Sequence, residues 1–99
     1  MPTVRWTDLA EQQLLQIRTR KLGEAVLAAA EGLVRFPRLG RPIPEQERFP
    51  PLAGVRDFTV KETVRVLYEY DERRDRIWIL GLLFPGQKFT PRRLGWPEA

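Results

Sequence analysis

The stretch GVRDFTVKETVRVLYEYDERRDRIWILGLLFPGQKF, residues 54–89, decides the fold because its apolar residues largely alternate with polar ones. A period of two places successive side chains on opposite faces of a strand, so the stretch predicts β-structure. Strands are predicted at Val55–Val60, Thr63–Asp71 and Ile77–Phe84, with a tight turn at 61–62 and a charged hairpin tip at 72–75. The last strand is almost uninterrupted apolar sequence, which is typical of a strand covered on both faces.

The second of these strands separates a predicted core face from a face that carries an arginine. Val64, Val66, Tyr68 and Tyr70 share one parity, which favours a packing role for the two tyrosines over base stacking or proton donation. Arg65 has the opposite parity. Since a buried guanidinium is costly unless it is paired, Arg65 is expected to face solvent, to pair with Asp57 or Glu69 across the strands, or to line a binding surface. The aromatic residues expected to serve packing are Trp6, Phe58 and Trp78.

The first third of the chain predicts one strand and two helices. Residues 3–6 alternate as a strand, and Thr7 or Asp8 offers an N-cap for a helix over about 8–21. Gly23 is interpreted as a break. A second helix is predicted from about 22–24 to Phe36, where Pro37 stops it. Its apolar stripe consists of Leu22, Val26, Ala29, Leu33 and Phe36. The short joint predicts an antiparallel helix hairpin.

The remaining segments complete a single domain over residues 1–99. Residues 37–53 contain five prolines and are predicted to form a stiff, extended connector rather than a domain boundary. Residues 85–99 form a basic tail. The predicted order is β-α-α-β-β-β, an α+β domain whose helix hairpin packs on one face of a mostly antiparallel, curved sheet.

Composition excludes several kinds of chemistry. The 99 residues contain no cysteine and no histidine, so thiolate zinc sites, cysteine nucleophiles and histidine acid–base catalysis are impossible. No phosphate-binding glycine loop or metal-ligand cluster is found, and we expect no cofactor and no metal. The acidic residues of the 71–75 hairpin are interleaved with arginines, as in a solvated turn. No long apolar run or basic-then-apolar N-terminus occurs, so we expect a cytoplasmic protein with no membrane partner.

The formal net charge is +4, and its positive part is concentrated in residues 35–56 and in the 85–99 tail. This distribution would suit a nucleic acid or an acidic protein surface, although an arginine-rich codon bias produces the same composition. The chemistry open to the chain is therefore centred on anions and led by arginine. The candidate binding residues on the sheet half and the tail are Arg56, Arg65, Lys88, Arg92, Arg93 and Trp96.

The chain resembles toxins of the RelE/ParE superfamily from bacterial type II toxin–antitoxin modules. The resemblance is carried by a strand and a helix hairpin ending in Phe36-Pro37, by GRPIPE at residues 40–45, and by the whole 54–89 run. Its individual positions, beyond the apolar pattern, are Gly54, Arg56, Arg65, Tyr68 and Gly86. The resemblance covers nearly the whole chain and implies the superfamily fold.

The resemblance implies two different activities. RelE-like members cleave messenger RNA on the ribosome, and in that case Arg65, Lys88, Arg92 and Arg93 would be the catalytic candidates. The tyrosine or histidine that such members carry after the last strand has no counterpart here, since no tyrosine follows Tyr70.

ParE-like members poison DNA gyrase and generally lack the nuclease residues. The proline-rich connector and the LLFPGQKFTP ending, residues 82–91, favour this branch, although Phe84 stands where many relatives have histidine. An inactive or non-enzymatic binding module of the same fold is the further alternative. Both the RelE-like and the ParE-like branch imply a cognate antitoxin, whose docking surface would include the open side of the helix pair and the cationic strand-and-tail face.

Overall fold

The structure is a computed structural model that describes residues 1–43 and 54–87. Its elements are β1 (Thr3–Trp6), α1 (Asp8–Leu15), α2 (Arg20–Gly32), β2 (Arg41–Pro42), β3 (Val55–Val60), β4 (Val64–Asp71) and β5 (Arg76–Leu83). The strands form one sheet in the order β1-β5-β4-β3-β2. Among the described strands only the β1–β5 pair is parallel, so the prediction of an α+β fold with a mostly antiparallel sheet is confirmed.

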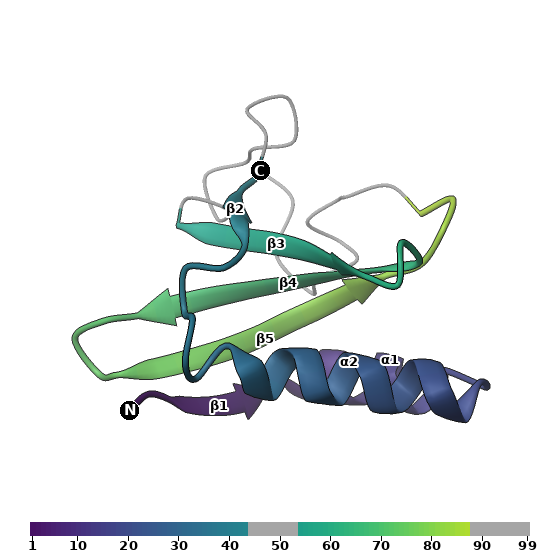
Figure 1. Ribbon diagram of the computed structural model, residues 1–99, viewed down its shortest axis with the longest axis horizontal. Helices are drawn as coiled ribbons and strands as arrows, with labels where there is room; N and C mark the ends of the chain where they lie inside the picture. Colours follow the sequence, from purple (N-terminus) through teal and green to yellow (C-terminus); the bar gives the residue numbers. More distant parts are fainter. Residues whose placement is uncertain (44–53, 88–99) are drawn as a thin grey trace.

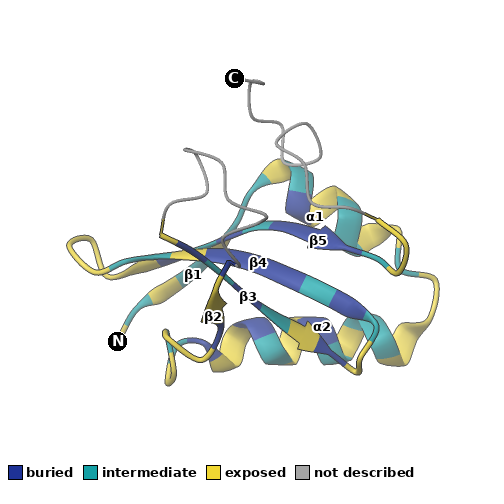
Figure 2. Ribbon diagram, turned by 90° about the horizontal axis from the view of Figure 1, so that it is seen from above, coloured by how far each residue is buried: buried dark blue, intermediate teal, exposed yellow. Residues whose placement is uncertain are grey.

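Both helices cover the same face of the sheet (Figure 1). The chain turns back between them, and α1 lies against β5 while α2 contacts β3 and β4. The main core lies between these layers and joins residues of α2, such as Val26 and Ala30, to Val66 of β4 and Ile79 of β5. Figure 2 shows buried residues concentrated along the two central strands. None of the helices in the described part of the chain has the length and apolar character needed to cross a membrane.

The helix boundaries differ from those that the sequence predicts. Helix α1 begins as expected, with the Thr7 hydroxyl accepting a hydrogen bond from the Ala10 N–H, but it ends at Leu15 rather than near residue 21. A tight turn follows, and Ile17 leaves the helix to pack against the core. Gly23 is therefore not a break. It lies inside α2, and its N–H donates to the Thr19 carbonyl over 3.0 Å.

The end of α2 was also predicted too late in the sequence. The helix stops at Gly32, and the chain continues in short turns toward Pro37. Leu33 is fully buried as predicted, whereas Phe36 is 64% exposed and does not extend the apolar stripe. The stripe fails at this point because the turns after Gly32 change the direction of successive side chains away from helical spacing.

The β-strand predictions are largely confirmed. Lys61 and Glu62 both have positive φ, at 53° and 56°, as in the mirror-image turns whose twist matches that of a hairpin. The hairpin between β4 and β5 is closed by Asp71, whose carboxylate accepts hydrogen bonds from the Arg74 backbone and side chain. These hydrogen bonds lower the pKa of the Asp71 carboxyl.

A register shift in the β4–β5 ladder changes the facing of β5. Tyr68 pairs with Ile79, but Leu67 pairs with Gly81, which leaves Leu80 as an extra residue. Ile79 and Leu82 consequently both join the core under the helices, although they are three residues apart. A strict period of two does not describe this strand.

The order β-α-α-β-β-β is incomplete, because the connector contains the two-residue strand β2. Arg41 pairs with Asp57 and Pro42 pairs with Arg56, which adds β2 antiparallel to β3 at the sheet edge. An edge position tolerates proline, since its missing N–H is not needed for a further ladder. A two-residue strand has no periodicity, so the sequence pattern did not reveal it. The predictions for connector residues 44–53 and for tail residues 88–99 lie outside the described residues.

Candidate functional site

The mid-strand arginine lies on the sheet face opposite the helices. The register places Arg65 of β4 beside Thr59 of β3, diagonally next to Asp57. The Arg65 Nε group is paired with the Asp57 carboxylate, and the Arg41 Nε lies 3.4 Å from the other carboxylate oxygen. We call Arg41, Asp57 and Arg65 the arginine–aspartate cluster.

Burial differs sharply among the three members of the cluster. The Asp57 side chain is 2% exposed, the Arg65 side chain 21% and the Arg41 side chain 69%. A carboxylate so deeply buried stays charged only where cations compensate its lost hydration, so both guanidiniums stabilise it. Arg65 was expected to face solvent, to pair across the strands, or to line a binding surface, and the structure shows the cross-strand pair with Asp57. The other predicted partner, Glu69, is exposed.

Arg56 does not join Arg65. It is paired in register with Tyr68 and therefore projects toward the helix side, where its Nη1 donates to the Gly40 carbonyl over 2.7 Å. Arg56 thus fastens the segment after α2 to the sheet. The remaining predicted site residues, Lys88, Arg92, Arg93 and Trp96, lie outside the described residues. Among the described residues, the structure therefore brings Arg65 together with Arg41, whereas the sequence predicted Arg65 and Arg56 as binding residues.

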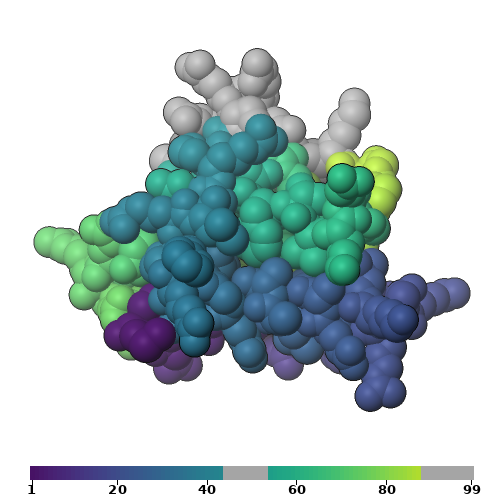
Figure 3. All heavy atoms as spheres, viewed as in Figure 1, coloured from purple at the N-terminus to yellow at the C-terminus, as the bar shows by residue number. Residues whose placement is uncertain are grey.

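Tyr68 holds the same connecting segment through two further hydrogen bonds. Its buried hydroxyl accepts a hydrogen bond from the Gly40 N–H and donates one to the Pro37 carbonyl, each over 2.8 Å. In the space-filling view this segment rises from α2 across the front of the molecule toward β2 (Figure 3). Burial raises the pKa of Tyr68, which opposes proton release near neutral pH. The hydroxyl therefore serves structure, as the predicted core role implies.

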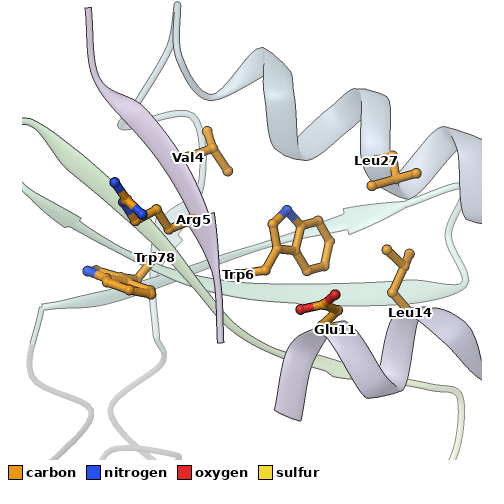
Figure 4. A pocket seen from close by; sticks show the side chains of 7 residues that line it. All are labelled: Val4, Arg5, Trp6, Glu11, Leu14, Leu27 and Trp78. Carbon is orange, nitrogen blue, oxygen red and sulfur yellow. The ribbon is translucent and has the colours of Figure 1, made fainter. Parts of the chain in front are cut away.

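A groove of about 450 Å³ lies around β1, between the two helices and the edge of the sheet. Its lining residues are Val4, Arg5, Trp6, Glu11, Leu14, Leu27 and Trp78, drawn in Figure 4. In that view Trp6 projects between Leu27 of α2 and Leu14 of α1.

The apolar pattern of the sequence did not predict this groove. Trp6 and Trp78 were expected to serve packing, and Trp6 does pack against the main core, but both side chains are also partly exposed. Leu27 is 41% exposed and stands beside Val26, outside the predicted apolar stripe of α2. An apolar residue outside the core stripe of a helix is the sequence signal from which this surface could have been predicted. Glu11 and Arg5 add one charge of each sign to an otherwise apolar lining.

The described residues provide no site for a metal ion. No group of three or more potential metal-ligating side chains comes together within residues 1–43 and 54–87. The described site chemistry therefore consists of the arginine–aspartate cluster on one sheet face and the apolar groove on the helix side.

Comparison with known proteins identifies the family. The family model described as ParE toxin of type II toxin-antitoxin system, parDE, matches residues 4–83. A chain in the toxin–antitoxin complex RelBE2 from Mycobacterium tuberculosis is 31% identical, with a TM-score of 0.70 over 85% of this chain and 99% of that one.

Two further solved structures share the fold at low sequence identity. A chain of the intact E. coli RelBE toxin–antitoxin complex is 8% identical, with a TM-score of 0.67 over 88% of this chain and 100% of that one. The isolated E. coli RelE toxin is 7% identical, with a TM-score of 0.63 over 89% and 88% of the two chains. A search of curated protein sequences finds no significant match. Given the family match and the 31% identical relative, this chain belongs to the ParE toxin family, within the RelE/ParE superfamily of type II toxin–antitoxin toxins.

Proposed function

We propose that this toxin arrests bacterial growth in the manner of the ParE branch, by poisoning DNA gyrase, and that a cognate antitoxin neutralises it. The observation that carries the proposal is the ParE family match across residues 4–83. The chemistry of the chain argues against the alternative activity and so supports this proposal. A messenger RNA nuclease needs a proton acceptor, a proton donor and available cations around the scissile phosphate.

The described residues are poorly equipped for that nuclease chemistry. The chain has no histidine, and its two tyrosines are Tyr68 and Tyr70. The Tyr68 hydroxyl is buried and engaged by Pro37 and Gly40. The cation of Arg65 is paired with Asp57 rather than presented alone. A non-nucleolytic toxin is therefore the function that these residues support best.

A RelE-like ribosome-dependent endoribonuclease is the second candidate. It is favoured by the relative with 31% identity, whose structure carries the name RelBE2. In this alternative Arg65, Lys88, Arg92 and Arg93 would stabilise the charged transition state. The non-enzymatic binding module remains the third candidate and predicts no growth defect on expression.

The proposed antitoxin partner is supported by the toxin–antitoxin complexes among the structural relatives. The groove around β1 provides apolar area for an amphipathic segment of such a partner, with Trp6 and Leu27 as the central contacts. Burial of large apolar side chains in a pocket supplies most of the binding energy in interfaces of this kind. We propose this groove as an antitoxin-docking surface.

Expression of the chain alone in bacteria tests the proposal. Gyrase poisoning predicts growth arrest with cleaved DNA–gyrase complexes and induction of the DNA-damage response, while transcripts stay intact. Purified gyrase with the purified toxin should then lose supercoiling activity. Growth arrest with cleaved transcripts and intact DNA would instead establish the nuclease alternative, and unimpaired growth would establish the binding module.

Co-expression with the cognate antitoxin is the matched control, since binding of the antitoxin should restore growth. A triple variant, Arg65→Ala with Arg92→Ala and Arg93→Ala, tests the predicted cationic residues. If this variant still arrests growth and binds antitoxin unchanged, those arginines are not part of the working surface.

A further inference from the structure

Asp57 places a negative charge on the sheet face where a mid-strand arginine would otherwise meet an anionic ligand. The Arg65 Nε group contacts one Asp57 oxygen, and the Arg41 Nε lies 3.4 Å from the other. The three side chains together carry one net positive charge instead of two. A phosphate that approaches Arg65 therefore meets a guanidinium already engaged by a carboxylate.

Displacement of that carboxylate is unfavourable because of where Asp57 lies. Its side chain is 2% exposed, so a phosphate that drew Arg65 away would leave a buried carboxylate compensated mainly by the exposed Arg41. Asp57 Oδ1 already lacks a hydrogen-bond partner among the described residues. Because the Asp57 carboxylate is buried, hydration cannot compensate for the loss of its ion pair with Arg65.

We propose that Asp57 is a specificity-determining residue that keeps this sheet face from binding phosphodiester backbones, by holding Arg65 in an internal ion pair. The residue acts by positioning Arg65 and by cancelling its charge, and it does not contact a ligand itself. The inference does not depend on gyrase as the target, since it concerns the binding of nucleic acid to the purified chain. Failure of the gyrase proposal would leave it intact.

The decisive experiment compares Asp57→Asn with the wild-type chain in binding a short single-stranded DNA oligonucleotide of mixed sequence. Asparagine keeps the size of the side chain and removes the charge. We expect about tenfold tighter binding at low salt, because Arg65 gains a charge-assisted contact with phosphate. The slope of log K against log salt should steepen by about 0.7, the value for one additional phosphate contact on a single strand.

Glu69→Gln is the matched control. Glu69 lies on the neighbouring strand β4 and on the same sheet face as Asp57, and it is exposed. Its substitution by glutamine changes the net charge by the same amount. A general charge effect would strengthen binding equally in both variants, and that result would overturn the proposal. The double variant Asp57→Asn with Arg65→Gln should return to wild-type affinity, which a purely structural role of Asp57 does not predict.

A measurement on the wild-type chain keeps the proposal testable if Asp57→Asn does not fold. The Arg65 Nε–H resonance should stay in place while the oligonucleotide is titrated to saturation, because its Asp57 partner is not displaced. Movement of this resonance in step with binding would overturn the proposal. Arg73 is exposed on the β4–β5 hairpin, and its side-chain resonance serves as the internal reference because it reports oligonucleotide contacts away from Arg65.

Discussion

Tyr68 ties strand β4 to the segment between α2 and β2 through its hydroxyl group. The residue belongs to β4, and its hydroxyl bonds the Gly40 N–H and the Pro37 carbonyl on the segment that leads from α2 into β2. Its ring packs edge-on against Phe58 of β3, with the ring centres 5.9 Å apart. The apolar parity of β4 predicted the buried ring, but no local pattern predicted the partners of the hydroxyl.

Tyr68→Phe should reduce the free energy of unfolding by about 2 kcal/mol, because it leaves the buried Gly40 N–H without an acceptor. Urea unfolding followed by circular dichroism measures the change. Tyr70→Phe is the control, since the structure gives the Tyr70 hydroxyl no hydrogen bond among the described residues. Equal losses in the two variants would contradict the role assigned to the Tyr68 hydroxyl.

The raised pKa of Tyr68 predicts a loss of stability in alkali. The unfolded chain releases the tyrosine proton at a pH near 10, whereas the folded chain retains it to higher pH because burial disfavours the phenolate. The stabilising contribution is therefore complete below about pH 10 and is lost as the pH rises toward the folded pKa. Unfolding curves across this range should show a smaller alkaline loss in Tyr68→Phe than in the wild type.

At the scale of elements, the two helices show how far local sequence signals reach. The sequence offered Thr7 or Asp8 as the cap of α1, and Thr7 is the cap in the structure; such a cap depends only on neighbouring backbone groups. Gly23 was misinterpreted as a break, because the burial of Ile17 in the core favours an earlier turn and glycine is tolerated inside a packed helix. Tertiary packing thus set the boundary that intrinsic helix propensity left open.

Gly23→Ala should raise the free energy of unfolding by about 0.8 kcal/mol, since alanine is the better helix former. The added Cβ would meet only Ile17 Cγ2, at an ordinary contact distance of 3.9 Å. Gly40→Ala is the opposite case, because its Cβ would lie 2.7 Å from the Asp57 carbonyl oxygen and the Tyr68 ring. Thermal unfolding should therefore show stabilisation in the first variant and a loss of about 2 kcal/mol in the second.

The turn between β3 and β4 has an unfavourable backbone conformation. Lys61 and Glu62 both adopt positive φ, which side chains with a Cβ disfavour by about 1 kcal/mol each. Replacing the pair by Asn-Gly, the preferred sequence of such turns, should stabilise the protein by about 1 kcal/mol. Chemical denaturation measures this gain, and an unchanged midpoint would show that the turn is not strained.

At the scale of the whole molecule, the groove around β1 exists only because two helices and two strands meet there. Leu27→Glu should weaken the binding of the cognate antitoxin at least about tenfold, since it places a charge in the apolar lining. Calorimetric titration measures the affinity. Leu27 is already 41% exposed, so the free energy of unfolding should change by no more than about 1 kcal/mol.

Leu39→Glu provides the matched control for this groove variant. Leu39 is 61% exposed and does not line the groove, yet the substitution introduces the same charge. Binding of the antitoxin to this control should equal that of the wild type. Equal weakening by both substitutions would show a general charge effect and would remove the groove as the docking surface.

The amino-acid sequence by itself determined strands β1, β3, β4 and β5, the hairpin turns and the core face of β4. These features depend on side-chain periodicity and on turn residues, which act over a few positions. The superfamily came from the resemblance of the chain to known toxins. Only the tertiary structure decided where α1 ends, that β2 joins the sheet edge, and that Asp57 rather than Glu69 pairs with Arg65. The reason is physical: burial, register shifts and ion pairing depend on which distant segments meet, and local periodicity carries no information about that choice.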